Sequence, residues 1–156
     1  MAIAREGAGV RHTTAALASQ VHPVFMLPPL AASGFGAVLA GSFDPLVGLA
    51  HAAAMFFAVY TAHVKDGFVD FYVRDEDDSH PMTMSGCRLA LAGSTAGFLL
   101  ATAVLLTTGG TVVALLTLPT WFIGYLHAPQ LDMHPVTATL GYPGGIALAI
   151  LGGYAA

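Results

Sequence analysis

Residues 89–126 read LALAGSTAGFLLATAVLLTTGGTVVALLTLPTWFIGYL, without a single charged side chain. A helix needs roughly 20 apolar residues to cross the hydrocarbon core of a bilayer, so this stretch is too long for one span and suits two. Gly109 and Gly110 mark the natural break, because paired glycines favour a turn. The stretch therefore predicts membrane helices over 89–106 and 111–126.

The composition of the whole chain agrees with this interpretation. Of its 156 residues, 56% are hydrophobic and 9% are charged, whereas an ordinary soluble domain has about 25% charged residues. A soluble domain needs a polar surface, but a protein whose surface faces lipid does not. The composition predicts an integral membrane protein, and a buried soluble helical domain is the weaker alternative.

Three further apolar runs are long enough to span a bilayer. They occupy residues 24–43, 46–64 and 136–155. Pro28 and Pro29 are expected to bend the first of these helices or to fray its start. We therefore predict an all-α fold, a multi-pass transmembrane bundle of about five helices over residues 21–156. Residues 1–20 are expected to form a polar N-terminal tail.

The basic residues predict the orientation of the bundle. All of them lie in the tail or around one polar segment: Arg5, Arg11, Lys65, Arg74 and Arg88. By the positive-inside rule that side faces the cytoplasm, and the aspartate-rich loop with it. The chain has no basic patch with interleaved aromatic residues, so we expect no nucleic-acid binding. The single cysteine, Cys87, excludes an intrachain disulfide.

The polar segment is HVKDGFVDFYVRDEDDSHPM, residues 63–82, which holds six of the nine acidic residues. If the preceding span continues for one or two turns, Asp66 and Asp70 lie on one helix face, with Cβ atoms about 6 Å apart. A cation between them would relieve their repulsion. Magnesium takes one or two carboxylates and fills its shell with water and phosphate oxygens. Lys65 and Arg74 are placed to contact the phosphates.

Simpler interpretations of the same segment stay open. Arg74 follows Asp70 by four residues, so the two side chains can form a surface ion pair. The consecutive acids at 75–78 are typical of a solvated loop.

Two histidines and several glycines allow other interpretations. His51 and His63 lie in the second span, where an ionisable side chain is either functional or hydrogen-bonded to a neighbouring helix. A small transporter built on them and Asp66 is a further alternative, and His63 is also expected to support Asp66. The pairs Gly93 with Gly97 and Gly141 with Gly145 have the spacing of helix-packing residues.

The order of these motifs resembles the UbiA superfamily of membrane prenyltransferases. Residues 65–75 resemble its first aspartate-rich motif, and 80–86 resemble the basic-Pro-Leu-x-x-Gly stretch that follows. Residues 125–131 are similar to the entry to the fifth helix of that family, and 140–145 to the helix itself. The resemblance covers roughly residues 22–156.

The chain departs from the family pattern in four ways. Lys65 stands where the family usually has Asn, and Asp66 and Asp70 are spaced by four where three is commonest. His80 replaces the usual Arg. Family members also have about nine helices and a second aspartate-rich motif, so this chain resembles the N-terminal half.

The resemblance implies transfer of an isoprenoid chain from a prenyl diphosphate donor to a lipophilic acceptor within membrane lipid. It implies Mg²⁺ as cofactor, held by Asp66 and Asp70 and, less strongly, by Asp75. Lys65 and Arg74 are expected to bind the diphosphate.

The expected function is that of a UbiA-like prenyltransferase, either active or in an incomplete or inactive form. Enzymatic activity is expected where the missing half or the second motif is supplied. A homo-oligomer that builds a full pocket from two copies is one such arrangement. The alternative is a non-catalytic multi-pass membrane protein that retains half of the scaffold.

Overall fold

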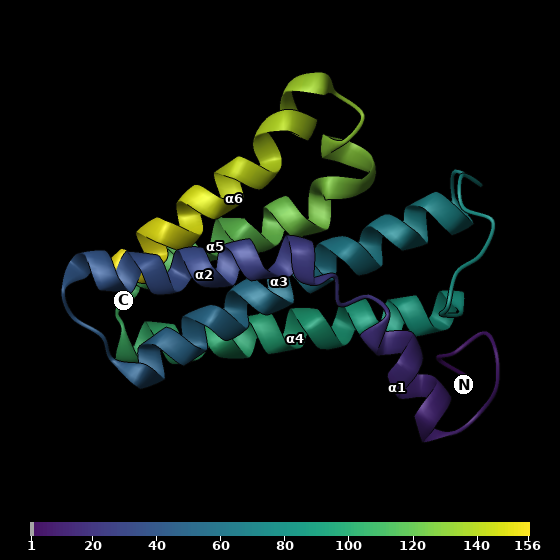
Figure 1. Cartoon of the computed structure of the whole chain (residues 1–156), viewed down its shortest axis with the longest axis horizontal. Coiled ribbons are helices and arrows are strands. Elements are labelled where there is room, and N and C mark those ends of the chain that lie inside the picture. Colours follow the sequence, from purple (N-terminus) through teal and green to yellow (C-terminus); the bar gives the residue numbers. More distant parts are fainter. Residues whose placement is uncertain (1) are drawn as a thin grey trace.

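The computed structural model describes residues 2–156, and it confirms the prediction of an all-α bundle (Figure 1). The described residues contain six α-helices and no strand. The elements in chain order are α1 (Val10–Ala18), α2 (Pro23–Ala40), α3 (Pro45–Tyr72), α4 (Met84–Thr108), α5 (Thr111–Leu126), the wide turn η1 (His127–Leu131) and α6 (Pro135–Ala155). Five of the helices, with α5 continuing through η1, are long and apolar enough to cross a membrane. The chain is an integral multi-pass membrane protein.

Helix α3 is longer than the apolar run 46–64 that predicts it. Its N-terminus is set by Asp44, whose carboxylate accepts hydrogen bonds from the backbone N–H groups of Leu46 at 2.8 Å and Val47 at 3.1 Å. Such a cap satisfies donors that lack a partner in the first turn. At the other end the helix continues to Tyr72, so Asp66 and Asp70 stand on a helix.

The prolines of α2 do not fray its start, because both lie inside a continuous helix that begins at Pro23. Pro29 has no N–H, so the carbonyl of Phe25 loses its partner within the helix. The hydroxyl of Tyr142 in α6 donates a hydrogen bond to that carbonyl at 3.1 Å. A neighbouring helix thus restores the bond that proline removes, as membrane helices require.

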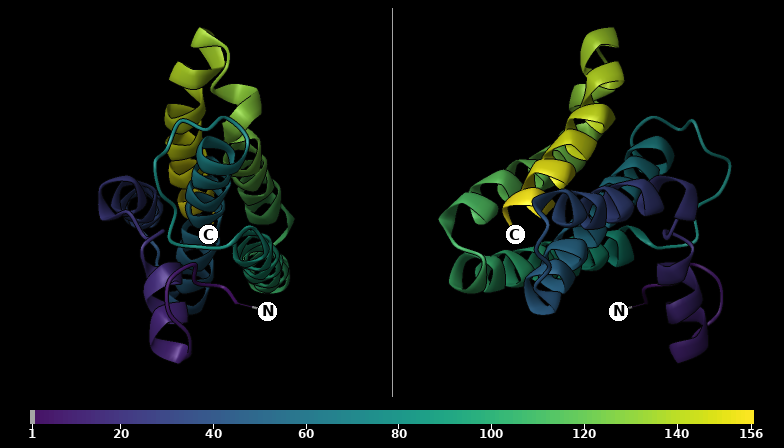
Figure 2. Two further views of the ribbon diagram at one scale, coloured as in Figure 1. Left: turned by 90° about the vertical axis from the view of Figure 1, so that its right-hand side faces the viewer. Right: turned by 60° about the vertical axis from the view of Figure 1, so that its left-hand side comes forward.

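Helix α3 lies at the centre of the bundle and packs against α2, α4 and α5, while α6 packs on α2 and α5 (Figure 2). Buried polar pairs join the helices within the apolar interior. Ser33 Oγ lies 2.7 Å from His51 Nδ1 between α2 and α3. Thr61 Oγ1 lies 2.8 Å from Ser94 Oγ between α3 and α4. Such bonds stabilise helix association in lipid, where the hydrophobic effect contributes little.

Helices α2 and α6 approach each other closely. A Cβ on Gly153 would overlap the backbone carbonyl of Ser33, so only glycine fits at this crossing. Gly97 also packs closely, against an aromatic ring of α3. The prediction of packing glycines is wrong for Gly93 and Gly145, where an added Cβ would meet open space.

The polar segments of the chain lie mainly at one end of the bundle. The segment 2–22, which includes α1, lies there beside the loop 73–83 that joins α3 to α4 (Figure 2). A hydrophobic cluster, separate from the main core of the bundle, joins the segment 2–22 to the loop and to α3 and α4. Its buried members are Ala4, Ala16, Val64, Met82, Cys87 and Ala90. We call this the polar end. Its cytoplasmic orientation is still a prediction.

Candidate functional site

Asp66 and Asp70 stand one turn apart near the C-terminal end of α3, and both line a cavity of about 410 Å³. We call it the polar cavity. Helix α3 forms one wall. The loop after α3 forms another, through Asp77, Ser79, His80 and Pro81, and the segment before α2 forms a third, through Ser19, Gln20 and His22. The predicted metal-binding pair therefore faces a space large enough for an anion and its waters.

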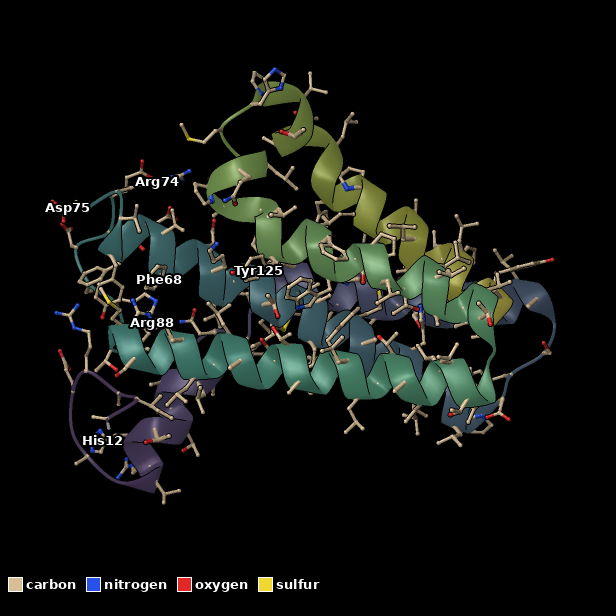
Figure 3. The ribbon with its side chains drawn as sticks, turned by 180° about the vertical axis from the view of Figure 1, so that it is seen from behind. His12, Phe68, Arg74, Asp75, Arg88 and Tyr125 are labelled. Carbon is tan, nitrogen blue, oxygen red and sulfur yellow. The ribbon has the colours of Figure 1, made fainter. Side chains whose placement is uncertain are left out.

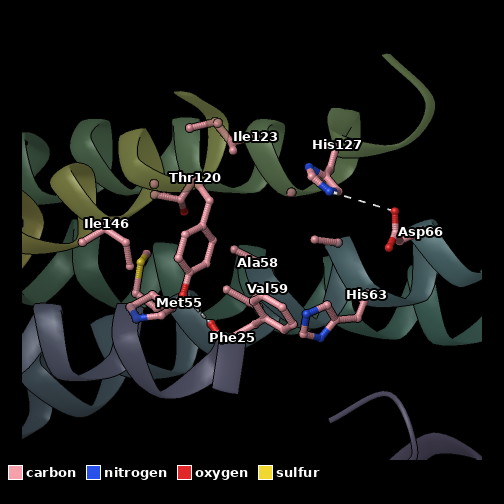
Figure 4. A pocket seen from close by; sticks show the side chains of 16 residues that line it. Phe25, Met55, Ala58, Val59, His63, Asp66, Thr120, Ile123, His127 and Ile146 are labelled. Atoms are coloured by element: carbon pink, nitrogen blue, oxygen red, sulfur yellow. Dashed lines mark hydrogen bonds and ion pairs between the residues drawn. The ribbon is translucent and has the colours of Figure 1, made fainter. Parts of the chain in front are cut away.

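A second cavity, of about 320 Å³, lies deeper in the bundle between α2, α3, α5 and α6 (Figure 4). We call it the apolar cavity, because most of its lining is hydrocarbon, including Met55, Ile123 and Ile146. Three residues line both cavities: Phe25, His63 and Asp66. A ligand with a polar head and an apolar chain would extend from one cavity into the other past Asp66.

Asp66 faces the end of α5 at this junction. Its Oδ1 lies 4.0 Å from Nε2 of His127, which extends from the end of α5 and also lines the apolar cavity (Figure 4). The two side chains are 42% and 37% exposed, so both are open to a ligand. His127 strengthens this contact when it is protonated, because only then does it carry a charge.

The two cations predicted to bind diphosphate have other partners in this structure. Lys65 Nζ lies 4.5 Å from the ring centroid of Tyr125, a cation–π contact between α3 and α5. Arg74 Nη1 lies 2.7 Å from a carboxylate oxygen of Asp132 and 3.3 Å from Asp70 Oδ1. The expected ion pair between Arg74 and Asp70 is present. Neither cation lines either cavity, and their diphosphate contacts stay a prediction.

The pair of Arg74 and Asp132 connects the loop after α3 to the connector between α5 and α6. The hydrogen bond from Arg74 lowers the pKa of the Asp132 carboxyl, and the same bond raises the pKa of Arg74. Each group thus favours the charged form of the other at neutral pH.

Asp75 lies apart from the other two predicted metal ligands. It is exposed on the loop after α3, with a left-handed φ of 57° (Figure 3), and it lines neither cavity. Within residues 2–156 no three side chains of His, Cys, Asp or Glu converge as a metal cluster. Two carboxylates beside a polar cavity still fit magnesium, which completes its shell with water and phosphate oxygens.

The cavity also contains residues that the sequence did not single out as ligands. Gln20 and His80 are both buried and line the polar cavity beside Gly67. His63 lines both cavities, and its Nδ1 lies 3.2 Å from the carbonyl of Gln20. His51 lies away from both cavities. No local pattern marks Gln20 as a cavity residue, because its contact with His63 joins positions 43 residues apart in the chain.

The chemistry of the site follows from this arrangement. The polar cavity suits an anion together with a divalent cation, and the apolar cavity suits a hydrocarbon chain, with Asp66 between them. The positions of the two cavities and of Asp66 come from the structure and are independent of the family resemblance. No known family, curated protein or solved structure matches this chain.

Proposed function

We propose that the chain is a UbiA-like prenyltransferase, which binds a prenyl diphosphate with Mg²⁺ and transfers the isoprenoid chain to a lipophilic acceptor. The single observation that carries the proposal is that the polar and apolar cavities share Asp66. A prenyl diphosphate is a small anionic head on a hydrocarbon chain. Its head suits the polar cavity and its chain suits the apolar cavity beside it. The motif order of the sequence supports the same proposal.

In this proposal Asp66 and Asp70 hold the magnesium. Their negative charges repel each other across one helical turn, and a divalent ion removes that repulsion. Bound there, Mg²⁺ would neutralise the charge of the diphosphate leaving group. Asp75 would join only after a rearrangement of the loop. Lys65 and Arg74 would reach the head group only by leaving Tyr125 and Asp132.

The apolar cavity holds the isoprenoid chain. Its hydrocarbon walls exclude water from the allylic carbon, whose bond to the diphosphate oxygen breaks during transfer. The nucleophilic acceptor then bonds to that carbon, and the diphosphate leaves with the bonding electrons. Phe25 lines both cavities and therefore lies beside the head–tail junction of a bound donor.

The proposal is tested by binding of farnesyl diphosphate to the full chain in lipid nanodiscs, with and without Mg²⁺. We expect Asp66→Asn and Asp70→Asn to lower the affinity by about tenfold or more, since each removes a charged ligand of the metal complex. Asp78→Asn is the matched control, because Asp78 is exposed on the same polar segment and lines neither cavity. Binding that ignores both substitutions, or that needs no divalent ion, contradicts the proposal.

A transfer assay with a lipophilic acceptor separates the enzyme from the alternative. Metal-dependent binding followed by transfer supports the prenyltransferase. Binding with no transfer at any protein concentration supports the non-catalytic membrane protein. Transfer that rises more steeply than the protein concentration supports a site assembled from two copies of the chain.

A further inference from the structure

Residues 2–22, which contain the described part of the predicted polar tail (1–20) and the two residues before α2, are attached to the polar end at two places. At the first, Ile3 to Arg5 pairs with the loop before α4 like two short strands. The N–H of Arg5 donates to the carbonyl of Pro81 at 2.9 Å, and the N–H of Thr83 donates to the carbonyl of Ile3 at 2.8 Å. The guanidinium of Arg5 also lies 4.5 Å from the ring centroid of Phe71.

The second attachment lies in the last turn of α1 and just after it, and it joins the segment to α3. Ala16 is only 5% exposed and belongs to the hydrophobic cluster of the polar end. The hydroxyl of Tyr60 donates to the carbonyl of Leu17 at 3.0 Å, and His63 Nδ1 lies 3.2 Å from the carbonyl of Gln20. The segment is therefore fixed on both sides of the polar cavity.

Between α1 and α2, the segment presents polar side chains to the cavity. Ser19 and Gln20 both line it, and Gln20 is only 6% exposed. The amide nitrogen of Gln20 donates to Ser19 Oγ at 3.2 Å, and Ser19 Oγ donates its one hydrogen to the carbonyl of Ala16 at 2.7 Å. The second N–H of Gln20 is therefore the donor left for another acceptor. These groups are neutral, unlike Asp66 and Asp70 on the α3 wall. A phosphate oxygen that does not contact the metal is stabilised by neutral donors of this kind.

We propose that residues 2–22 form a strap that closes the polar cavity and that the side-chain amide of Gln20 donates a hydrogen bond to a phosphate oxygen of the bound head group. The contact with phosphate rests on the proposed function, whereas the closure of the cavity does not. The strap is therefore a wall of the binding site, and its sequence contributes to the choice of ligand.

The phosphate contact is tested with Mg²⁺ and inorganic pyrophosphate as the probe, followed by Mg²⁺ and farnesyl diphosphate. Gln20→Glu replaces a donor by a negative charge of the same shape, so we expect about a tenfold loss of affinity for both probes. Gln130→Glu is the control, because Gln130 is exposed in η1 and lines neither cavity. We expect this control to bind like the wild type.

The outcomes separate the two proposals. If the wild type binds neither probe, the proposed function is overturned, and the phosphate contact with it. If the wild type binds and both glutamate variants behave alike, only the contact by Gln20 is overturned. A loss confined to farnesyl diphosphate would place Gln20 near the hydrocarbon chain and would also overturn the contact with phosphate.

The closure is tested without any ligand, through the reaction of Asp70→Cys with a cationic thiosulfonate in a Cys87→Ala background. Ala16→Glu inserts a charge under α1 and should release the strap, which raises the reaction rate by about tenfold or more because the cavity becomes open to solvent. Ala15→Glu is the control, because Ala15 is exposed on the same helix. Equal rates in the two variants would overturn the strap. Tyr60→Phe, which removes only the bond to Leu17, gives a milder release if Ala16→Glu fails to fold.

Discussion

The hydroxyl of Tyr142 in α6 lies 3.1 Å from the backbone carbonyl of Phe25 in α2. The carbonyl is free because Pro29, four residues later, has no N–H to offer. Both residues line the apolar cavity. One hydrogen bond therefore corrects a proline defect, joins two helices and fixes part of the cavity wall.

Removal of this bond should destabilise the bundle modestly. We expect Tyr142→Phe to lower the free energy of unfolding by about 1 kcal/mol, in the range measured for hydrogen bonds between membrane helices. Thermal unfolding in detergent measures the change. Tyr154→Phe is the control, since Tyr154 is 57% exposed on the same helix. Equal stability of the two variants would mean that the bond contributes nothing.

At the crossing of α2 and α6, any side chain larger than that of glycine at position 153 should destabilise the bundle. Gly153→Leu forces the two backbones apart, so we expect a loss of about 1–3 kcal/mol or more in the free energy of unfolding. Gly144→Ala on the same helix meets open space and should stabilise α6 by about 0.5–1 kcal/mol. The same unfolding assay compares them. A Gly153→Leu variant as stable as the wild type would contradict the close approach.

The ion pair of Arg74 and Asp132 should make part of the stability depend on pH. The hydrogen bond from Arg74 lowers the pKa of Asp132 below its ordinary value of about 3.9. The folded state therefore binds this proton less readily than the unfolded state. The contribution of the pair is complete above about pH 5 and is lost as the pH falls through the lowered pKa of Asp132.

Asp132→Asn removes this contribution at every pH. We expect its melting temperature to lie below that of the wild type at neutral pH and to approach it as the pH falls through the lowered pKa of Asp132, where the carboxyl becomes neutral in both states. Asp78→Asn, an exposed aspartate of the loop, should show no such convergence. A constant difference between the wild type and Asp132→Asn across the whole range would contradict the assignment.

The predicted orientation can be read from two exposed serines at opposite ends of the bundle. Ser79 lies in the loop after α3, and Ser42 lies in the turn between α2 and α3. With a membrane-impermeant thiol reagent applied to whole cells, Ser42→Cys should react and Ser79→Cys should react only after lysis. The reverse pattern would mean that the positive-inside rule fails for this chain.

The fold was predictable because the signal for membrane helices is local. The length of an uncharged stretch such as 89–126 indicates how many membrane helices it forms, and Gly109 and Gly110 indicate where the two helices separate. The predicted position of Asp66 and Asp70 on one helix face followed from the same local geometry. These two aspartates do line one cavity, although their ligand is still untested.

The remaining features depend on contacts between distant parts of the chain. The strap pairs Ile3 with Thr83 through backbone groups that every residue has, so no residue type in the sequence predicts this pairing. Spacing of four selects Gly93 as readily as Gly97, although only Gly97 packs closely on a neighbour, because spacing does not say which face of a helix meets a neighbour. Similarly, the partner of Arg74 in the connector is Asp132, a pairing that appears only once the helices are assembled.

The length of α3 sets the depth of its carboxylates in the bilayer. Its 28 residues extend about 42 Å, against a hydrocarbon core of about 30 Å. If the helix starts at one interface, its last two turns, with Asp66 and Asp70, emerge among the lipid head groups. A thicker membrane would draw these carboxylates toward hydrocarbon, whereas a thinner one would leave them in water. Hydrophobic mismatch would then tune ligand binding at this site.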